Sequence, residues 1–434
     1  MNYRETLDFL NRRGNEVLGI HLGLYRIQTV MEALGNPNRK FPALHIAGTN
    51  GKGSVAAMSE SILRHAGWKT GLYTSPHLVR VEERIKINGQ EISPRTFARL
   101  TTEVHKKELA LHAKGTLDRP LTFFEIITAA AFLCFARARV DIAVVEVGLG
   151  GLLDATNVVT PQACIITGIS HDHQGLLGKT LAQIAAEKAG IIKPGIPVIS
   201  GCRRESARRI LLQKARAAQS HIYEVDGDCR IQIENERDGR ALINLHTPAR
   251  SYAHMWLSLA GEHQARNAAL AVMGVELLKD FPVRKADVRR GLASTIWPGR
   301  LDSFRLPRRT LMDGAHNPEG AQSLRDFLSG RKESEVHLVF AALQDKDIKR
   351  MGACLFPLAQ TIHLAQLSNA RSAHPREVKE AHRNFHDRIF IHENPEAALK
   401  GAWQKCSPRG LVVVSGSLYL LGALLPLIRR LNRS

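Results

Sequence analysis

Short apolar runs alternate with longer amphipathic stretches along most of the 434-residue chain. The runs have the length and β-branched content of buried strands, and the stretches have the periodicity of helices. Such alternation is typical of βαβ units around a mainly parallel sheet, so we predict an α/β fold. The predicted strands are residues 43–46, 142–146, 163–167, 197–200, 336–340, 361–364 and 411–414, and the predicted helices are residues 53–66, 122–138, 182–189, 205–218, 264–278 and 320–328.

Residues 222–258 depart from this pattern. Polar and apolar residues alternate within 230–234, 241–246 and 252–257, which predicts an antiparallel excursion joined to the α/β core. A rigid turn, Trp297-Pro-Gly-Arg300, then precedes a second series of strands and helices. We therefore predict two domains, residues 1–297 with a mainly parallel sheet and residues 298–434 as a smaller, Rossmann-like α/β domain.

Composition is that of an ordinary globular protein, with 44% hydrophobic and 23% charged residues. Six scattered cysteines without a CxxC pair favour reduced thiols, and the N-terminus shows no secretory signal, so we expect a cytoplasmic protein. Residues 410–428 carry no charge and are long enough to span a bilayer. Their Ser-Gly-Ser interruption instead indicates a buried strand that turns into a helix, so we expect no membrane partner.

The charge balance is unusual. Sixty Lys and Arg against 41 Asp and Glu give a net charge of +19 and a pI near 10. Such charge favours anionic partners, which include nucleic acids, acidic membranes and phosphate- or carboxylate-bearing small molecules. The excess is spread over the chain, +12 in residues 1–300 and +7 in residues 301–434, and forms no basic arm.

The strongest chemical signal is the glycine-rich segment Gly48-Thr49-Asn50-Gly51-Lys52-Gly53-Ser54, which joins a predicted strand to a predicted helix. In such a loop, backbone N–H groups and a lysine bind phosphates, and a serine hydroxyl can bind Mg²⁺. The spacing differs from the standard GxxxxGK[ST] pattern, because Gly53 separates Lys52 from Ser54. We predict that this loop binds a nucleoside triphosphate and that the N-terminal domain is a P-loop ATPase domain.

Polar residues follow two further predicted strands. Glu146 ends the strand 142–146 before a glycine turn, and His171-Asp172-His173 follows the strand 163–167. Ligands of open parallel sheets bind at this edge, and a carboxylate there needs a cation, for which Mg²⁺ is the natural candidate. The His-x-His pair lacks further ligands at zinc spacing, so we expect no dedicated zinc site.

Together these segments resemble the folylpolyglutamate synthase/dihydrofolate synthase family, which belongs to the Mur-ligase-like ATP-dependent amide ligases. The resemblance covers nearly the whole chain, with its pieces in order. The pieces are Gly23-Leu-Tyr-Arg-Ile, Gly48-Thr-Asn-Gly-Lys-Gly-Ser, Thr74-Ser-Pro-His-Leu, Glu83-Arg-Ile-Lys-Ile-Asn-Gly, Leu121-Thr-Phe-Phe-Glu, Glu146-Val-Gly-Leu-Gly-Gly-Leu-Leu-Asp-Ala-Thr-Asn, Asp172-His, Glu187-Lys-Ala-Gly-Ile, Gly261-Glu-His-Gln-Ala-Arg-Asn-Ala, Pro298-Gly-Arg, Asp313-Gly-Ala-His-Asn-Pro and Ser415-Gly-Ser-Leu-Tyr.

The resemblance implies an enzyme of folate biosynthesis and one-carbon metabolism. ATP would phosphorylate a folate or pteroate carboxylate to an acyl phosphate, and the amine of L-glutamate would then attack it. The enzyme would be a dihydrofolate synthase, a folylpolyglutamate synthase or both, and bacterial relatives are often bifunctional. The implied cofactors are ATP, two Mg²⁺ ions and a carbamylated Lys188. We expect a monomer with small-molecule substrates and no nucleic-acid partner.

The resemblance also assigns roles to residues. Lys52 and the loop amides would hold the β- and γ-phosphates, and Ser75, Glu146 and His173 match magnesium ligands, with Ser54 a further candidate. The residues that match ATP contacts are Gln264 and Asn267 on the adenine side and Arg300, Asp313 and His316 in the C-terminal domain, where the glutamate-ligase domain would lie. Lys52, Lys188 and His316 are the candidate catalytic residues.

For the pterin-bearing substrate, the candidates are Pro76, Phe124, Asp154 and Ser417. A flat pterin needs a stacking surface and a polar partner. Phe123 and Phe124 can instead be helix core, and we expect this of at least one of them. Leu152 stands where many relatives have arginine, which puts in doubt a charge contact from this position.

Two other functions remain open at this point. A Mur-type ligase for UDP-sugar peptides is less favoured, because the segments Thr74-Ser-Pro-His-Leu and Phe123-Phe-Glu fit folate better. A nucleic-acid-binding ATPase would normally gather its basic residues on a stripe with aromatic partners, whereas aromatics make up only 6% of this chain.

Overall fold

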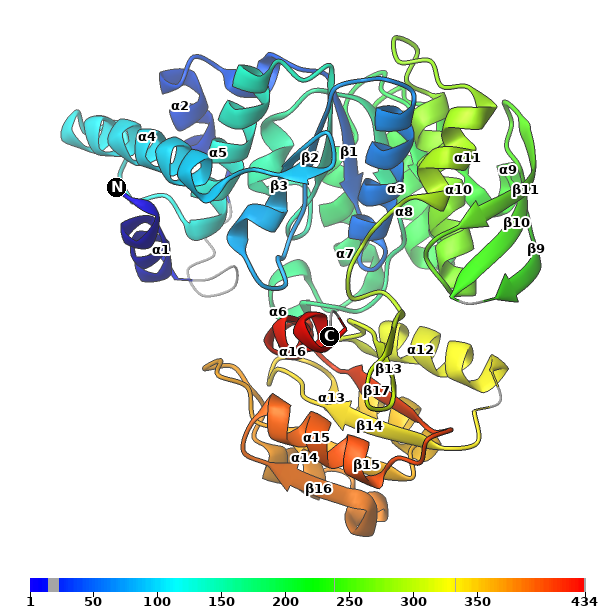
Figure 1. Cartoon of the computed structure of the whole chain (residues 1–434). Coiled ribbons are helices and arrows are strands. Elements are labelled where there is room, and N and C mark those ends of the chain that lie inside the picture. The colour runs from blue at the N-terminus through cyan, green and yellow to red at the C-terminus, as the bar shows by residue number, and fades with distance from the viewer. Residues whose placement is uncertain (15–22, 238, 332, 433–434) are drawn as a thin grey trace. The chain divides into compact units, whose positions relative to one another are not determined.

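The computed structural model describes residues 1–14, 23–237, 239–331 and 333–432 (Figure 1). The chain divides into two compact units. Unit 1 has Met1–Gln232, Ile243–Leu257 and Ala265–Thr295, and unit 2 has Ile233–Leu242, Ser258–Gln264 and Ile296–Ser434. Two short segments of unit 2 come before the predicted domain boundary at 297/298. The boundary itself stays a prediction.

Unit 1 is built on an eight-stranded sheet with the order β4-β3-β2-β5-β1-β6-β7-β8. The six strands from β2 to β8 in this order pair in parallel, while β3 and β4 add an antiparallel edge. The parallel strands β1, β5 and β6 are almost wholly buried, as their apolar runs predict. The strand bounds are β1 Ala43–Ala47, β2 Thr70–Tyr73, β3 Ile85–Ile87, β4 Gln90–Glu91, β5 Ile142–Glu146, β6 Pro161–Ile166, β7 Val198–Ser200 and β8 Ile222–Glu224.

The helices of unit 1 cover this sheet. In α5, every residue from Glu125 to Phe135 is buried, in agreement with its apolar surface on all sides. The helices α3 and α11 are in close contact, because a Cβ atom on Gly291 would lie 2.6 Å from the Cα atom of Ile62. The helix bounds are α1 Tyr3–Arg12, α2 Tyr25–Ala33, α3 Lys52–His65, α4 Pro94–Ala113, α5 Phe123–Ala138, α6 Gln174–Leu177, α7 Leu181–Lys188, α8 Glu205–Ala217, α9 Val225–Asp228 and α11 Lys285–Ala293.

The polar, alternating segment forms a separate three-stranded sheet with the order β11-β10-β9. Its strands are β9 Arg230–Arg237, β10 Arg240–His246 and β11 Ser251–Leu257, so all three predicted strands are present. In β10, buried and more exposed residues alternate, which explains the alternation in the sequence. The helix α10, Glu262–Glu276, follows.

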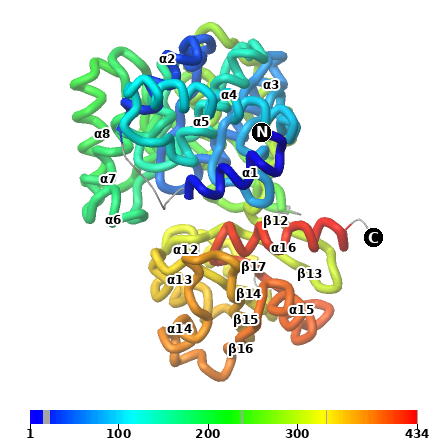
Figure 2. The backbone as a smooth tube through the Cα atoms, turned by 90° about the vertical axis from the view of Figure 1, so that its left-hand side faces the viewer, coloured from blue at the N-terminus to red at the C-terminus, as the bar shows by residue number. Residues whose placement is uncertain are grey.

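Unit 2 is built on a six-stranded sheet with the order β12-β13-β17-β14-β15-β16, which is parallel except for β12. Helices α12, α13 and α14 lie on one side of this sheet and α15 and α16 on the other (Figure 2). The bounds are β12 Asp302–Arg305, β13 Arg309–Met312, β14 Val336–Phe340, β15 Thr361–Ala365, β16 Ile389–His392, β17 Leu411–Ser415, α12 Pro318–Gly330, α13 Ile348–Leu355, α14 Pro375–Glu380, α15 Pro395–Lys405 and α16 Leu418–Leu431.

Both sheets confirm the predicted α/β class, with a mainly parallel sheet in the N-terminal part and a smaller one in the C-terminal part. The uncharged stretch 410–428 contains the buried strand β17 and most of α16, as predicted. No helix among the described residues is both long and apolar enough to cross a membrane. The six cysteines are free.

Candidate functional site

The candidate site of unit 1 lies at the carboxyl ends of four neighbouring strands. These strands lie in the order β2-β5-β1-β6. Ser75 follows β2, Glu146 ends β5, the loop Gly48–Ser54 follows β1, and the segment 167–173 follows β6. Parallel strands present their carboxyl ends at one edge of the sheet, where ligands of open α/β folds bind. The topology therefore gathers the predicted phosphate and metal residues of unit 1 at this edge.

The glycine-rich loop fits closely against the segment that follows β6. Gly48 has φ +148°, and a Cβ atom there would lie 1.9 Å from Oγ1 of Thr167, so glycine is required. The N–H of Thr49 donates to the carbonyl of Gly168 at 2.8 Å, and the Thr167 hydroxyl donates to the carbonyl of Asn50 at 2.6 Å. These hydrogen bonds fix the course of the loop.

Helix α3 begins at Lys52, directly after Gly51 in the left-handed conformation. Nζ of Lys52 donates to the carbonyl of Thr49 at 3.3 Å, so the ammonium group lies over the loop. Ser54 in the first turn of α3 is 1% exposed, and its hydroxyl has no hydrogen-bond partner among the described residues. A buried hydroxyl without a partner is costly, which fits a position that binds a ligand.

Glu146 is a buried carboxylate, 3% exposed, at the end of β5. Its Oε2 atom accepts a hydrogen bond from the backbone N–H of Ser75 at 3.1 Å, so these two predicted metal ligands lie side by side. His173 is half-buried and follows Asp172, whose Oδ2 atom is 3.8 Å from Nε2 of His173. His171 is exposed.

Lys188 is the last residue of α7 and is only 4% exposed. Its Nζ atom donates a 2.8 Å hydrogen bond to the carbonyl of Gly48 in the loop. Burial, together with the charge of Lys52, lowers the pKa of Lys188 from 10.5 to about 7, although Asp172 and other nearby acids act in the opposite direction. Lys188 is therefore not a lysine on a solvated helix face.

The two adjacent phenylalanines at the start of α5 have different surroundings. The guanidinium of Arg84 lies over the ring of Phe123, 5.3 Å from its centroid. The ring of Phe124 lies against Gly148, where a Cβ atom would come within 2.3 Å of it, and 6.1 Å from the ring of Tyr73. Both rings are half-buried against the core, and the predicted substrate contact of Phe124 stays a prediction.

Three other predicted substrate residues differ in exposure. Asp154 is buried and accepts hydrogen bonds from the N–H groups of Leu149 and Thr156 and from the Thr156 hydroxyl, so it holds its own turn. Burial raises its pKa. Ser417 caps α16 and is 2% exposed, whereas Pro76 is exposed. Leu152 is 42% exposed.

Gln264 and Asn267, the predicted adenine contacts, lie one turn apart on α10 and are both buried. Asn267 touches the glycine-rich loop, because a Cβ atom on Gly51 would lie 2.6 Å from its Oδ1 atom. The structure thus brings Asn267 to the predicted phosphate loop.

In unit 2, Arg300 lies just before β12, and Asp313 and His316 follow the end of β13. Asp313 accepts hydrogen bonds from the N–H groups of Leu301 and Ala315, and Nδ1 of His316 contacts the carbonyl of Gly314 at 2.8 Å. Arg300 donates to the carbonyl of Gly299 at 2.8 Å.

Two titratable residues beside this group were absent from the predicted site. Burial raises the pKa of Asp302 to about 6 and lowers that of His263. Both follow motif residues directly or closely, since His263 lies within Gly261-Glu-His-Gln and Asp302 two residues after Arg300. Their closeness to the motifs is the signal that could have pointed to them.

The residues at the sheet edge of unit 1 fit a magnesium ion. The buried Ser54 hydroxyl without a partner and the buried Glu146 carboxylate offer the oxygen ligands that Mg²⁺ prefers. Ser75 and His173 are the other residues predicted to hold it.

Comparisons with known proteins give matches over nearly the whole chain. Residues 46–275 match the Mur ligase middle domain, and residues 299–418 match the Mur ligase glutamate ligase domain. The chain is 35% identical to the dihydrofolate synthase/folylpolyglutamate synthase of Bacillus subtilis, over 94% of this chain and 95% of that one. It is 33% identical to the folylpolyglutamate synthase of Lacticaseibacillus casei, over 98% of each chain.

Solved structures show the same likeness. The folylpolyglutamate synthase of Mycobacterium tuberculosis complexed with ADP superimposes with a TM-score of 0.92 and 33% identity, over 98% of each chain. E. coli FolC in complex with DHPP and ADP gives a TM-score of 0.89 and 29% identity, over 99% of this chain and 98% of that one. The chain therefore belongs to the folylpolyglutamate synthase/dihydrofolate synthase family of Mur-ligase-like, ATP-dependent ligases.

Proposed function

We propose that this protein uses ATP to join the amine of L-glutamate to the carboxylate of dihydropteroate or of a reduced folate. The observation that carries the proposal is the meeting of the glycine-rich loop, Ser75 and Glu146 at adjacent strand ends, with the Ser54 hydroxyl buried and without a hydrogen-bond partner among the described residues. The names of the relatives include both activities, so we propose a bifunctional enzyme.

Two steps make up the proposed reaction. The substrate carboxylate attacks the γ-phosphorus of ATP, so that an acyl phosphate forms and ADP leaves. The glutamate amine then attacks the acyl carbon, a C–N bond forms, the C–O bond to phosphate breaks, and inorganic phosphate and a proton are released. Since all the reactants carry negative charge, catalysis consists mainly of alignment and charge neutralisation.

The residues of unit 1 support the first step. The N–H groups at the start of α3 and the Lys52 ammonium would bind the phosphates, and Asn267 against Gly51 would border the nucleotide. Mg²⁺ held by Ser54, Ser75, Glu146 and His173 would neutralise phosphate charge when bound.

We further propose that Lys188 is carbamylated and helps hold a second Mg²⁺. An uncharged amine is the form that reacts with CO2, and burial lowers the pKa of Lys188 to about 7. The carbamate would change a buried cation into an anion beside the loop. This proposal is separate from the ligase activity itself.

The remaining candidate residues keep their predicted roles as proposals. Arg300, Asp313 and His316 would act on ATP from the C-terminal ligase domain, 298–434, and Gln264 on its adenine. Pro76 and Phe124 would border the pterin-bearing substrate. Asp154 and Ser417 remain proposed substrate-binding residues, and both are buried, where they also hold a turn and a helix end.

Product analysis tests the function. Purified protein is incubated with ATP, Mg²⁺ and L-glutamate, and dihydropteroate and a reduced folylmonoglutamate are offered separately. A bifunctional enzyme forms dihydrofolate from the first and a diglutamate from the second, each with one ADP per bond. Turnover of only one substrate would make the enzyme monofunctional, and turnover of only UDP-muramoyl substrates would refute the folate proposal.

A further inference from the structure

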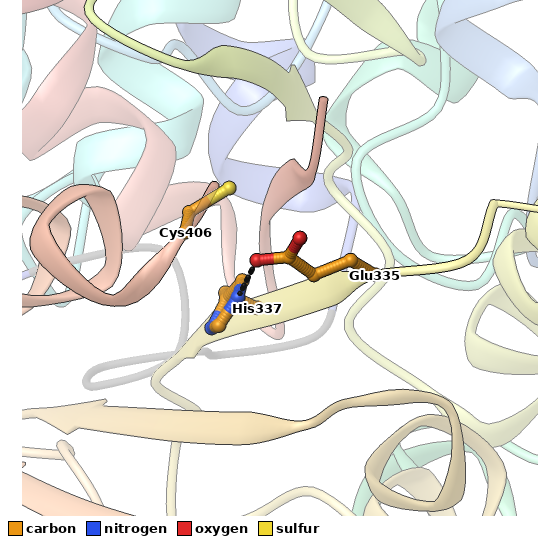
Figure 3. A group of neighbouring side chains, drawn as sticks. All are labelled: Glu335, His337 and Cys406. Carbon is orange, nitrogen blue, oxygen red and sulfur yellow. Dashed lines mark hydrogen bonds and ion pairs between the residues drawn. The ribbon is translucent and has the colours of Figure 1, made fainter. Parts of the chain in front are cut away.

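A second group of possible metal ligands lies in unit 2, away from every residue assigned above. Glu335 directly precedes β14, His337 lies within it, and Cys406 directly follows α15. One carboxylate oxygen, one imidazole nitrogen and the sulfur all lie within 4.8 Å of one another. Figure 3 shows the three side chains together.

The three side chains form a cluster that is mostly buried from solvent. The side chain of His337 is 3% exposed and Cys406 is 2% exposed, while the side chain of Glu335 is 20% exposed. Gly410 closes the cluster, because a Cβ atom there would lie 2.6 Å from Sγ of Cys406 and 2.9 Å from Cδ of Glu335. Solvent thus reaches the cluster mainly beside the carboxylate.

We propose that Glu335, His337 and Cys406 bind a zinc ion that joins the end of α15 to the start of β14. A set of one sulfur, one nitrogen and one carboxylate oxygen suits Zn²⁺, whereas Mg²⁺ and Ca²⁺ prefer oxygen alone. Water would take the fourth position on the side of Glu335. The site is structural and independent of the proposed ligase function.

Little movement is needed between His337 and Glu335, whereas the sulfur of Cys406, within 4.8 Å of both, has up to about 1 Å to move. Ligand atoms at usual Zn²⁺ distances in a tetrahedron lie about 3.3 to 3.6 Å apart. Nε2 of His337 and Oε1 of Glu335 are 2.9 Å apart and joined by a hydrogen bond, so they have to separate by only a few tenths of an ångström. The zinc ion takes the place of the shared proton.

The other nitrogen of His337 is already held as a ligating histidine requires. Nδ1 lies 2.6 Å from Oγ1 of Thr361, which lies 2.9 Å from Nε2 of His363. Nδ1 of His363 in turn lies 2.9 Å from Nε2 of His392. With a proton on Nδ1 of His337 and of His363, the hydrogen bonds run from His337 to Thr361, to His363 and to His392, and Nε2 of His337 is left with a lone pair for the metal.

The cluster has a second possible state without metal. The carboxylate of Glu335 also accepts hydrogen bonds from the N–H of Ser407, at 2.7 Å, and from the Ser407 hydroxyl. Sγ of Cys406 lies 3.4 Å from the carbonyl of Ser407. These contacts satisfy the hydrogen-bonding capacity of the carboxylate without a metal. The experiment must therefore separate a purely hydrogen-bonded cluster from zinc binding.

Cobalt substitution makes that separation. The full-length protein is stripped with a chelator and titrated with Co²⁺ in excess Mg²⁺, which occupies sites made of oxygen ligands. We expect one equivalent of Co²⁺ to give a near-ultraviolet thiolate-to-cobalt band, which Zn²⁺ then removes. Absence of the band from the unmodified protein would overturn the proposal.

Variants assign the band. Cys406→Ser should abolish it, while Cys354→Ser, at a partly buried thiol elsewhere in unit 2, should keep it. Thr361→Val should weaken Co²⁺ binding by about 10- to 100-fold, the effect typical of a group that orients a ligating histidine. A band that survives in Cys406→Ser would overturn the site. If that variant does not fold, Glu335→Gln carries the test, since it keeps the thiol and should weaken binding by more than Thr361→Val.

Discussion

Nζ of Lys188 donates a 2.8 Å hydrogen bond to the carbonyl oxygen of Gly48, a residue 140 positions earlier in the chain. This bond joins the end of α7 to the first glycine of the phosphate loop. A lysine buried in this place costs stability while it is charged, so its position beside the loop points to a chemical use.

Replacing Lys188 by alanine should lower the rate of folate-dependent ADP release by on the order of 100-fold, because the loop loses the group held against Gly48. If the lysine acts as a carbamate, added short-chain carboxylates should restore part of the rate. Lys193→Ala is the control, since Lys193 is half-buried five residues further on and contacts the carbonyl of Asn157. Absence of rescue, or an unmodified intact mass in bicarbonate, would count against the carbamate.

The protonation of Lys188 should also appear in the stability of the protein. Its folded pKa of about 7 lies below its ordinary value of 10.5, so between these values the unfolded chain binds more protons. The free energy of unfolding should therefore rise with pH across this window. Lys188→Met should lack this contribution, and denaturant unfolding without bicarbonate at pH 6.5 and 9 measures it. An equal pH dependence in both proteins would contradict the lowered pKa.

Ser54→Ala should separate ligand binding from stability. The hydroxyl has no hydrogen-bond partner among the described residues, so its removal should change the free energy of unfolding by less than about 1 kcal/mol. The Mg²⁺ concentration for half-maximal activity should nevertheless rise. Ser59→Ala is the matched control, because Ser59 is also buried in α3 without such a partner but lies beyond the first turn. Equal Mg²⁺ titrations in the two variants would remove Ser54 from the site.

Glu146→Gln should lower activity by on the order of 100-fold and raise the Mg²⁺ requirement, because the carboxylate charge at the end of β5 is lost. The backbone N–H of Ser75 can still donate to the amide oxygen, so the fold should persist. Glu60→Gln is the comparison, since Glu60 is a buried carboxylate of α3 that pairs with Arg64. That variant should lose stability and keep the Mg²⁺ titration of the unmodified protein.

Glu108→Ala should destabilise unit 1 by about 3 to 5 kcal/mol, the usual cost of breaking a buried ion pair. The Glu108 side chain is fully buried and accepts hydrogen bonds from Arg13, His105 and the N–H of Leu121. On the same helix, Glu103 pairs with Arg137 at the surface, and Glu103→Ala should cost about 1 kcal/mol or less. Urea unfolding compares the two, and equal losses would contradict the role of Glu108.

Elements with a clear local signal were predicted well from the sequence. β5 and β14 have the predicted bounds, because β-branched runs between polar or turn residues define a buried strand. The helix after the glycine-rich loop begins at Lys52, one residue earlier than predicted. The loop itself could be predicted because glycines, a lysine and a serine occur together between a strand and a helix.

Contacts between distant segments could not be predicted in this way. The approach of Gly48 to Thr167 and of Gly291 to Ile62 leaves no periodic pattern in the sequence. The same holds for Cys406 beside Glu335, which depends on how α15 ends over the sheet. The turn around Asp154 did carry a local signal, since an aspartate two residues before a threonine often caps a turn with its side chain.

The placement of the candidate site on β2, β5, β1 and β6 has a consequence for the order of folding. The pairing of β1 with β5 and β6 joins residues about one hundred or more positions apart, as Ile46 with Glu146 and with Ile165. Pairings of such high contact order form slowly and late, because the entropy of closing a long loop is lost before the strand contacts contribute favourable free energy. Nucleotide affinity should therefore arise only once unit 1 has reached its native topology, and a bound nucleotide would selectively retain chains that have completed this step.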